Sequence, residues 1–453
     1  MEITKGSLKS TIAVSLTNYL DAGAIVAGAS GLTLWQNYLG LTEGHLGWLN
    51  AISANCFGAA IGAIIGGFLA DKYGRKTIYT YNMFVYMLGV AIIMFTVNFP
   101  MLLTGFLITG ISVGAGVPAS WTYISENSEV GKRGRNMGIS QFAWGVGPTI
   151  ILLLGMLLAP GKADSSAGVL FSYVQKTATF ILGDNASVDA INVFSSRLIF
   201  GSLFIVAFVA WTMQRKLHES KDWEDAKQSK EKQPGVFSSF GSLFTNKVNI
   251  RTMLYLAIIY ISWNMVASVM GFFQPHIYET AGGLSNGDAN MVSAIQWLVI
   301  IAVTYFGFAM FVDKVNQRWF YFFGTLLGVA AWCVLIFIGI KNYAALWAFT
   351  ILWGIHAGVG VQAFYALWAS ELFPAKYRAG AQGIMFFFVR GIAGLWGLAF
   401  VNIYGKNGEG FNTAAYLMIG LLLIALIVGT IWTPKTRGKT LQQITKERYG
   451  DDI

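Results

Sequence analysis

Twelve long apolar runs dominate this chain and constrain its fold more than any other feature. The runs occupy approximately residues 11–36, 47–70, 77–97, 100–125, 136–160, 193–214, 250–275, 289–312, 319–340, 344–370, 379–403 and 413–433. Each is long enough to cross a hydrocarbon core about 30 Å thick as a helix of about 20 residues. Charged residues make up only 12% of the 453 residues, against about a quarter in a soluble domain. The sequence therefore predicts an all-α polytopic membrane protein with twelve transmembrane helices.

The basic residues are distributed unevenly between the two sets of loops. The loops on the side of the two termini hold 24 of the 31 lysines and arginines, and the opposite loops hold four. Cytoplasmic loops are enriched in Lys and Arg, so both termini are predicted to be cytoplasmic in a cell (inner) membrane. The net charge of +9 is then loop charge, and no nucleic-acid partner is expected. The two cysteines lie inside apolar runs, and no cofactor or metal site is predicted.

The two halves of the chain repeat each other. Asp71 after the second run corresponds to Asp313 after the eighth, an offset of 242, and Glu126 corresponds to Glu371 at an offset of 245. In both halves an arginine follows that glutamate by seven residues. We therefore predict a duplicated six-helix unit. The predicted parts are a bundle at 1–214, a cytoplasmic connector at 215–249, a bundle at 250–433 and a cytoplasmic tail at 434–453, whereas the long outer loop at 161–192 receives no explanation from the sequence.

Four segments carry a resemblance to a known family. They are residues 67–76 (GFLADKYGRK), 123–126 (YISE) followed by Arg133, 371–374 (ELFP) followed by Arg378, and 434–441 (PKTRGKTL). With them the chain resembles the major facilitator superfamily, and within it the sugar porters and related metabolite:H+ symporters. The resemblance implies two six-helix bundles with a substrate site between them near mid-membrane and alternating access to it.

Departures from the sugar-porter pattern concern substrate recognition. Helix seven carries Ser262, Trp263 and Ser268 where sugar porters have a glutamine pair and an asparagine. Phe106 stands at the position where the proton-coupled members have an arginine facing the helix-one aspartate. Helix ten reads GVQAFY at 360–365 in place of a Gly-Pro pair and a tryptophan. The hexose-binding pattern is therefore absent.

Two charged side chains lie deep in apolar runs, where each costs about 2.5 to 3.5 kcal/mol on insertion scales. Asp21 is predicted to carry the coupling proton, because burial favours the neutral carboxyl group and the resemblance places the coupling aspartate there. The alternative is a structural carboxylate held by backbone or hydroxyl partners. Arg390 is predicted to bind an anionic group of the substrate through its planar guanidinium, the alternative being an interhelical contact.

Further polar and aromatic residues within the runs are candidates for substrate binding. Together with Arg390, the predicted substrate-binding residues are Gln141, Trp144, Trp263, Asn264, Ser268, Gln274 and Gln362. Gln141 is included because the resemblance assigns it a role in sugar binding, and Trp263 because an aromatic ring packs well on a sugar ring. The alternative for most polar groups of this kind is hydrogen bonding between helices. His356 has two interpretations, a group that titrates near neutral pH and, more often for a lone histidine, a satisfied polar group.

The charged loop residues form a separate group, which we predict to be a cytoplasmic gate that holds the inner face closed during part of the cycle. Its members are Asp71, Arg75, Glu126, Arg133, Arg135, Glu371 and Arg378. Surface charge pairs contribute about 0 to 1 kcal/mol each, which suits contacts that break in every cycle. The alternative is that these charges serve topology alone.

The function predicted from the sequence is secondary active transport, not enzymatic catalysis. The expected substrate is a small polar metabolite, namely a sugar, a sugar derivative, or a sugar acid or other organic anion, taken up with a proton by a monomeric protein in contact with lipid. A facilitative uniporter of the same substrates and a non-transporting sensor with the same fold are the alternatives.

Overall fold

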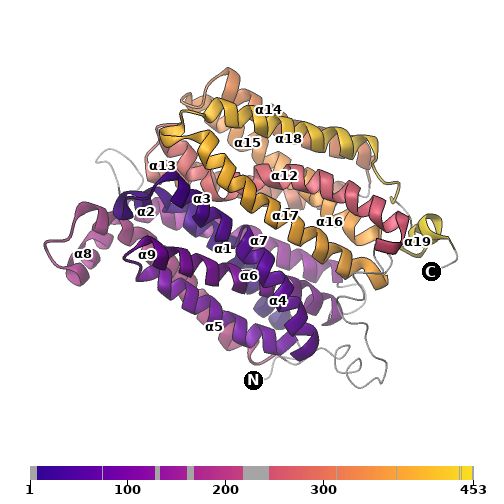
Figure 1. Cartoon of the computed structure of the whole chain (residues 1–453), viewed down its shortest axis with the longest axis horizontal. Helices are drawn as coiled ribbons and strands as arrows, with labels where there is room; N and C mark the ends of the chain where they lie inside the picture. Colours follow the sequence, from indigo (N-terminus) through magenta and orange to yellow (C-terminus); the bar gives the residue numbers. More distant parts are fainter. Residues whose placement is uncertain are drawn as a thin grey trace. The chain divides into compact units, whose positions relative to one another are not determined.

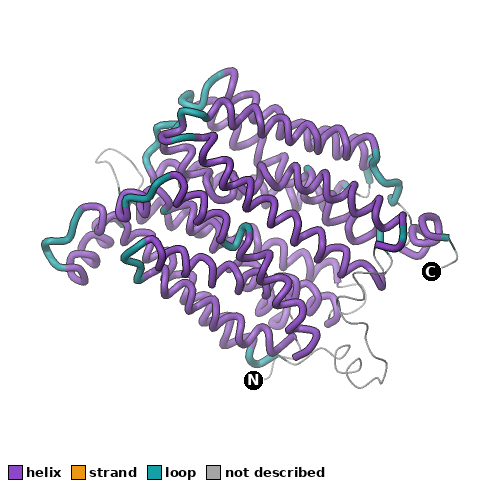
Figure 2. Tube along the Cα trace, viewed as in Figure 1, coloured by secondary structure: helices purple, strands orange, loops and turns teal. Residues whose placement is uncertain are grey.

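The computed structural model of the chain describes residues 8–73, 75–127, 133–160, 168–217, 244–312, 314–373, 375–437, 439 and 441–450. Within these ranges the backbone alone is described at residues 8, 9, 11, 67–73, 75–77, 79, 117–127, 133–141, 370, 375–380, 382, 383, 441 and 442. Within the described ranges the secondary structure is helical and includes no strand (Figure 2).

Helices account for nearly every element of the described chain (Figure 1). In the first half they are α1 (Leu8–Ser30), α2 (Leu32–Leu39), α3 (Glu43–Ile52), α4 (Phe57–Tyr73), α5 (Arg75–Met94), α6 (Phe99–Asn127), α7 (Arg133–Leu158), α8 (Phe171–Leu182) and α9 (Val188–Gln214). In the second half they are α12 (Lys247–Thr280), α13 (Asn286–Ala302), η1 (Val303–Ala309), α14 (Gln317–Phe337), α15 (Tyr343–Val359), α16 (Val361–Glu371), α17 (Ala375–Tyr404), η2 (Lys406–Gly408), α18 (Phe411–Ile431) and α19 (Leu441–Tyr449).

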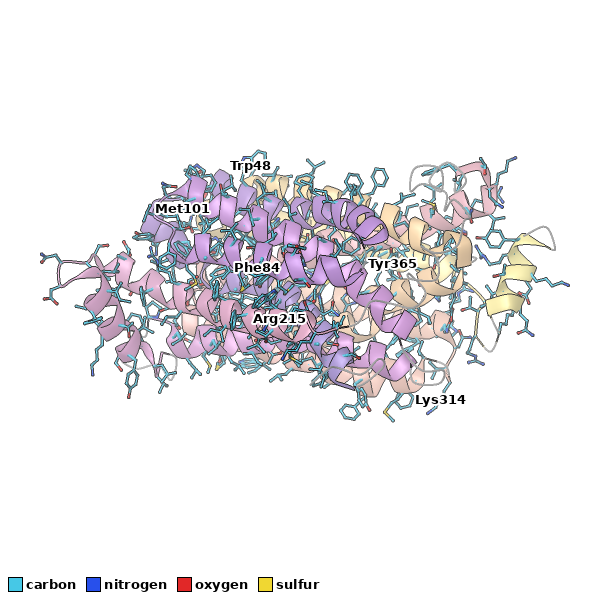
Figure 3. The ribbon with its side chains drawn as sticks, turned by 90° about the horizontal axis from the view of Figure 1, so that it is seen from below. Trp48, Phe84, Met101, Arg215, Lys314 and Tyr365 are labelled. Atoms are coloured by element: carbon cyan, nitrogen blue, oxygen red, sulfur yellow. The ribbon has the colours of Figure 1, made fainter. Side chains whose placement is uncertain are left out.

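The membrane segments agree with the twelve apolar runs. Among the described residues, ten helical stretches are long and apolar enough to cross a membrane, and Thr80–Met94 and Phe142–Leu158 are shorter apolar helices. Each of these twelve stretches coincides with one predicted run. Large apolar side chains such as those of Trp48 and Phe84 are exposed on the outer surface of unit 1 (Figure 3), as expected for positions that face lipid. The predicted fold class is confirmed.

Helix α12 extends beyond the predicted apolar run at both ends. The run is predicted only approximately, at residues 250–275. In the structure α12 continues through Pro275 to Thr280. The helix therefore includes His276 and Glu279, which lie just beyond the predicted run.

Several membrane segments are interrupted rather than continuous. The first run consists of α1 and α2, separated at Gly31, and the tenth consists of α15 and α16, separated at Gly360. At Gly31 an added Cβ would overlap the Ser196 side chain, lying 2.7 Å from its Cβ. A glycine at the break lets α2 approach α9, where Trp35 Nε1 donates a hydrogen bond to Ser196 Oγ at 2.9 Å. The eighth run includes the π-helical turn η1.

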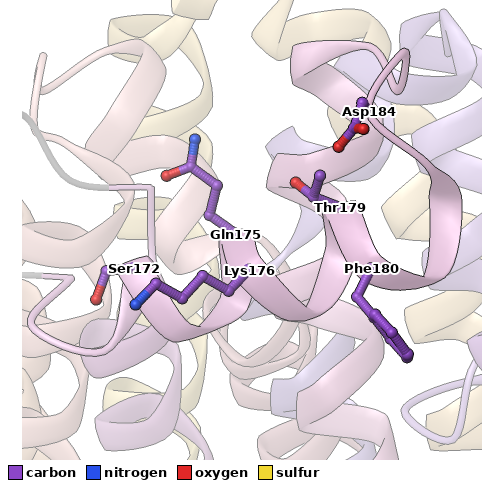
Figure 4. A pocket seen from close by; sticks show the side chains of 6 residues that line it. All are labelled: Ser172, Gln175, Lys176, Thr179, Phe180 and Asp184. Carbon is purple, nitrogen blue, oxygen red and sulfur yellow. The ribbon is translucent and has the colours of Figure 1, made fainter.

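The outer loop contains a helix that the sequence did not predict. Helix α8 buries Val174 and Ala178 against Phe194 of α9, which gives this loop a small apolar core of its own. Its opposite face is exposed, and Lys176 and Phe180 there line a shallow surface depression with Ser172, Gln175, Thr179 and Asp184 (Figure 4). The depression lies on the surface of one short helix, so it does not have the enclosed form of a solute site.

The chain forms two compact units, which do not coincide with its two halves. Unit 1 comprises Met1–Lys230, Ser268–Trp297 and Gly394–Phe411, and unit 2 comprises Glu231–Ala267, Leu298–Ala393 and Asn412–Ile453. In unit 1, α1 packs against α6, α7 and α9, and α6 packs against α4 and α5. In unit 2, α14 packs against α15 and α16. The boundaries of the two bundles and the connector remain a prediction, and residues 218–243 of the connector lie outside the described part.

Small residues bring α4 and α6 into direct backbone contact. An added Cβ on Gly62 would overlap the Ile111 carbonyl, and one on Gly114 would overlap the Ala59 carbonyl. Only residues without a bulky side chain allow helices to approach this closely. The spacing of glycines along α4 therefore sets the packing distance in unit 1.

Helix α19 of the C-terminal segment packs within unit 2. The Tyr449 hydroxyl donates a hydrogen bond to Asn249 Oδ1 at 2.8 Å. The same hydroxyl oxygen lies 3.1 Å from the Leu372 carbonyl oxygen. Arg448 Nη2 contacts Thr252 Oγ1 at 2.5 Å. These contacts attach the tail to the start of α12.

Candidate functional site

Asp21 lies in the middle of α1 and is almost completely buried, with 5% of its surface exposed. Its Oδ2 accepts a hydrogen bond of 3.1 Å from Nε1 of Trp144 on α7. The Trp144 ring meets Trp297 of α13 edge to face, with 5.4 Å between the ring centroids. The structure thus brings together two predicted site residues that are 123 positions apart in the chain.

Phe106, at the position where the resemblance implies an arginine, lies in an apolar environment. Its side chain is 4% exposed and packs edge to face with Phe200 and Phe272, at centroid distances of 6.0 and 6.2 Å. The Trp144 donor to Asp21 comes from a different helix and is uncharged. A neutral donor stabilises an ionised carboxylate less than a guanidinium does.

Gln274 forms a reciprocal amide pair with Gln296 inside unit 1. Nε2 of Gln274 donates to Oε1 of Gln296 at 2.9 Å, and Nε2 of Gln296 donates to Oε1 of Gln274 at 3.0 Å. Gln274 also donates to the Tyr278 hydroxyl at 3.0 Å. An amide has two N–H donors, so the donors of Gln274 are used while Gln296 keeps one free.

In unit 2, Trp263 and His356 form a hydrogen-bonded pair. Trp263 Nε1 lies 3.0 Å from His356 Nε2, and His356 Nδ1 lies 2.9 Å from the Gly324 carbonyl oxygen. The indole only donates and the carbonyl only accepts, so the imidazole is neutral and carries its hydrogen on Nδ1. Both ring nitrogens are satisfied, which confirms the interpretation of His356 as a structural polar group and fixes the Trp263 ring.

Two tyrosines form an aromatic stack with Trp263 in unit 2. The rings of Tyr260 and Tyr365 stack with 3.8 Å between centroids and 6° between planes. Tyr260 also lies nearly parallel to Trp263, at 5.9 Å and 12°. The sequence did not identify these tyrosines, because tyrosines in an apolar run are not distinguished from lipid-facing ones by sequence alone.

The remaining predicted residues occupy different environments. Asn264 is 5% exposed and its Oδ1 has no hydrogen-bond partner. Arg390 is 8% exposed, with Cζ 4.9 Å from the centroid of the Phe386 ring. The Ser268 carbonyl accepts a hydrogen bond from Asn55 Nδ2 at 2.8 Å, so Ser268 takes part in this contact through its main chain. Gln362 is half-buried on α16.

Most of the predicted gate lies outside the described side chains. This applies to Asp71, Arg75, Glu126, Arg133, Arg135 and Arg378, and also to the substrate candidate Gln141. Glu371 is the one gate residue with a described side chain, and it is half-buried. The gate remains a prediction.

A polar cluster in unit 1 was missed by the sequence. We name it the Glu279 cluster and define it as Ser30, Thr33, His276, Glu279, Asn286 and Asn290. It joins the α1–α2 break to the end of α12 and the start of α13. The signal that would have found it is a continued helix past Pro275, which places a histidine and a glutamate one turn apart at a membrane boundary.

Comparison with known proteins identifies the family. Residues 11–398 match the sequence family described as the Major Facilitator Superfamily. The chain belongs to this superfamily. The relatives and structural neighbours of the chain are transporters rather than enzymes, and the superfamily membership predicted from the sequence is confirmed.

Two relatives from Bacillus subtilis (strain 168) cover most of the chain. The minor myo-inositol transporter IolF is 39% identical over 455 residues, which cover 98% of this chain and 94% of the relative. A putative niacin/nicotinamide transporter NiaP is 21% identical over 422 residues, which cover 89% of this chain and 90% of the relative.

Solved structures show the same fold at low sequence identity. The inward open conformation of the xylose transporter XylE from E. coli has a TM-score of 0.71 at 16% identity and covers 97% of this chain and 99% of that chain. A D-xylose-proton symporter has a TM-score of 0.72 at 18% identity and covers 95% and 99%. At these identities the likeness concerns the fold alone.

Proposed function

We propose that the protein is a secondary active transporter that takes up a cyclic polyol of the inositol type together with a proton. The observation that carries this proposal is the 39% identity to a myo-inositol transporter along 98% of the chain. The hexose-binding residues of sugar porters are absent from helix seven, which favours a cyclic polyol over an ordinary hexose. The protein would act by alternating access, as a monomer in the cell membrane.

The buried polar and aromatic groups suit a neutral polyol. Such a ring presents hydroxyl groups around its edge and C–H groups on its faces, so it needs both hydrogen-bonding groups and flat apolar surfaces. Unit 1 offers the remaining N–H of Gln296 in its pair with Gln274, and unit 2 offers the unpartnered Asn264 Oδ1 and the aromatic ring of Trp263. We propose that these groups contact the substrate.

Asp21 is the proposed proton carrier. A carboxylate in the middle of a membrane helix is costly when charged, and the neutral Trp144 N–H offsets only part of that cost. Protonation from one side and release to the other would couple the proton to substrate movement. Protonation would remove the negative charge of Asp21 and weaken its hydrogen bond with Trp144. The contact between α1 and α7 would therefore change when the proton binds.

Orientation follows from the distribution of basic residues, with both termini in the cytoplasm. The predicted gate residues would then close the inner end of the molecule, and the Glu279 cluster would lie at the outer end.

Uptake of radiolabelled myo-inositol into proteoliposomes tests the proposal, with and without an inward proton gradient. We expect accumulation that depends on the gradient in the unaltered protein. In Asp21→Asn, which cannot release a proton, we expect gradient-driven accumulation to fall at least about tenfold while substrate exchange persists. Gradient-independent uptake in both proteins would instead identify a facilitative uniporter, and binding without uptake would identify a sensor.

An organic anion is a second candidate substrate, supported by a specific observation. Arg390 is buried on α17 with Phe386 beneath its guanidinium, a setting that suits a planar carboxylate. A more distant relative carries the name of an anion transporter. It is a probable quinate permease of Aspergillus oryzae (strain ATCC 42149 / RIB 40), which is 22% identical over 88% of this chain and 78% of that protein. Competition of labelled inositol uptake by quinate and nicotinate, repeated in Arg390→Gln, separates the two candidates. Competition that disappears in the variant would favour the anion.

A further inference from the structure

In the Glu279 cluster the Thr33 hydroxyl lies between two titratable groups, hydrogen-bonded to His276 and close enough to Glu279 to interact with it. Thr33 Oγ1 lies 3.0 Å from His276 Nδ1, and the same hydroxyl is within hydrogen-bonding reach of the Glu279 carboxylate. His276 is 3% exposed. The path therefore runs from an imidazole through a hydroxyl to a carboxylate, and all three groups belong to unit 1.

The carboxylate end of this path is attached to the helices around it. Asn286 Nδ2 donates to Glu279 Oε1 at 3.0 Å and to the Ser30 carbonyl oxygen at 3.0 Å. Asn290 Nδ2 also donates to the Ser30 carbonyl, at 3.2 Å. Asn286 thus connects Glu279 to the end of α1, directly before the break at Gly31.

A hydroxyl group has one hydrogen to donate, so the path has a direction. With Glu279 ionised, Nδ1–H of His276 donates to Thr33 Oγ1, and the Thr33 hydroxyl donates to the carboxylate. With Glu279 protonated, the carboxyl O–H donates to Thr33 and Thr33 donates to a bare Nδ1. The two arrangements differ by one proton.

We infer that Glu279 is a second proton-binding site of the transporter, filled through His276 and Thr33. A proton binds Nε2 of His276, the Nδ1 hydrogen passes to Thr33, and the Thr33 hydrogen passes to Glu279. The imidazole ends neutral in its other tautomer, and the net change is one proton gained by the carboxylate. This inference rests on the proposed function, because a bound proton has a role only where the outer end opens and closes.

Protonation removes the charge that strengthens the Asn286 contact. A hydrogen bond to an ionised acceptor is roughly twice as strong as a neutral one. The neutral carboxyl therefore holds Asn286 less firmly, and the contact of Asn286 with Ser30 loses support. The end of α1 is then freer to separate from α12 and α13, which opens this end of unit 1.

Other titratable groups near the cluster have partners of their own. Tyr404 of α17 lies 2.6 Å from Thr280 Oγ1, and Asp288 of α13 accepts the Ser285 hydroxyl at 2.6 Å. Glu43 of α3 accepts Gln36 Nε2 at 3.1 Å and interacts electrostatically with Lys406. Tyr278 of α12 and Tyr38 of α2 are further titratable groups on the helices that carry the cluster. The Arg197 guanidinium of α9 lies against two rings of α2, with Cζ 5.8 Å from the Trp35 centroid and 5.5 Å from the Tyr38 centroid. In the described part of the chain no cation forms an ion pair with Glu279.

A buried cysteine reporter tests the inference without reference to substrate. Ser30→Cys is placed in a background with Cys56→Ala and Cys333→Ala, and its labelling by a membrane-impermeant maleimide is timed in right-side-out vesicles. Dividing the rate by that of the same reporter with Glu279→Gln cancels the titration of the thiol itself. We expect a ratio near one at about pH 5 and a labelling rate about three- to tenfold below that of Glu279→Gln at about pH 9, where the carboxyl group is mostly ionised.

Matched variants identify the path. Thr33→Val keeps the side-chain shape but removes the hydroxyl, and we expect it to flatten the pH profile. Glu409→Gln and Thr104→Val change exposed residues of unit 1 in the same way and should keep the parent profile. A rate ratio that does not change with pH would overturn the role of Glu279, and a parent-like profile in Thr33→Val would overturn the path through Thr33. Failure of inositol uptake would leave these profiles unchanged, so the two proposals are tested separately.

Discussion

At the residue scale, Asp21 accepts a hydrogen bond from Trp144, and Phe106 stands where the resemblance implies an arginine. The sequence identified Asp21 because a carboxylate inside an apolar run is conspicuous. It identified Trp144 only as one polar aromatic among several, since nothing in a linear sequence shows that the indole N–H of α7 points at α1.

Trp144→Phe removes that donor and keeps most of the aromatic volume. The N–H stabilises the charged carboxylate, so without it Asp21 holds its proton to higher pH. We expect the pH of half-maximal uptake to rise by up to about one unit, because one hydrogen bond contributes about 0.5 to 1.5 kcal/mol. Initial rates of uptake at a series of pH values measure this shift. Trp48→Phe, at an exposed position, is the control, and an unchanged profile in Trp144→Phe would show that the contact does not influence proton binding.

His356 gives a second prediction, concerning stability. Its imidazole is fully buried, with Gly324 and Trp263 as partners, so His356→Ala leaves a cavity and an unpaired indole N–H. We expect a loss of about 2 to 4 kcal/mol, seen as a lower unfolding temperature of the purified protein. Adding Trp263→Phe to His356→Ala removes the unpaired donor and should recover part of the loss. If the two effects simply add, the indole is not paired with the imidazole.

At the scale of helices, the contact between α4 and α6 depends on the absence of side chains. In Gly62→Ala the added methyl group would overlap the main-chain carbonyl of Ile111, which cannot move aside as a flexible side chain would. We expect destabilisation of at least about 2 kcal/mol, measured by thermal unfolding in detergent. Gly420→Ala in α18 is the matched control, since nothing lies within 4 Å of its added Cβ. There the better helix propensity of alanine predicts no loss, and equal losses at both positions would refute the packing argument.

The end of α12 lies beyond the end of the apolar run from which the helix was predicted. The predicted apolar run ends near Pro275, and a proline inside a helix removes one backbone hydrogen-bond donor. The structure continues the helix past Pro275 to Thr280. That extension carries His276 and Glu279 into contact with α2 and α13.

At the scale of the whole molecule, orientation yields a prediction that does not depend on the substrate. Lys176 on α8 and Lys435 after α18 are both exposed, and the basic-residue distribution places them on opposite sides of the membrane. In a background with Cys56→Ala and Cys333→Ala, we expect Lys176→Cys to react with an impermeant thiol reagent in intact cells. Lys435→Cys should react only after the membrane is permeabilised. The reverse pattern would place the termini outside.

The sequence by itself determined the number of membrane segments and the superfamily. The lengths of the apolar runs and the loop motifs are local properties that can be recognised in the sequence alone. It also singled out Asp21, since a charged side chain inside a membrane helix costs free energy and is therefore rare without a function or a partner. Only the tertiary structure decided the partners, such as Trp144 for Asp21, Gly324 for His356 and Asn286 for Glu279. These partners come from helices far apart in the chain, and hydrogen bonds between them depend on helix rotation and close backbone approach. Neither quantity is encoded in any single segment of the sequence.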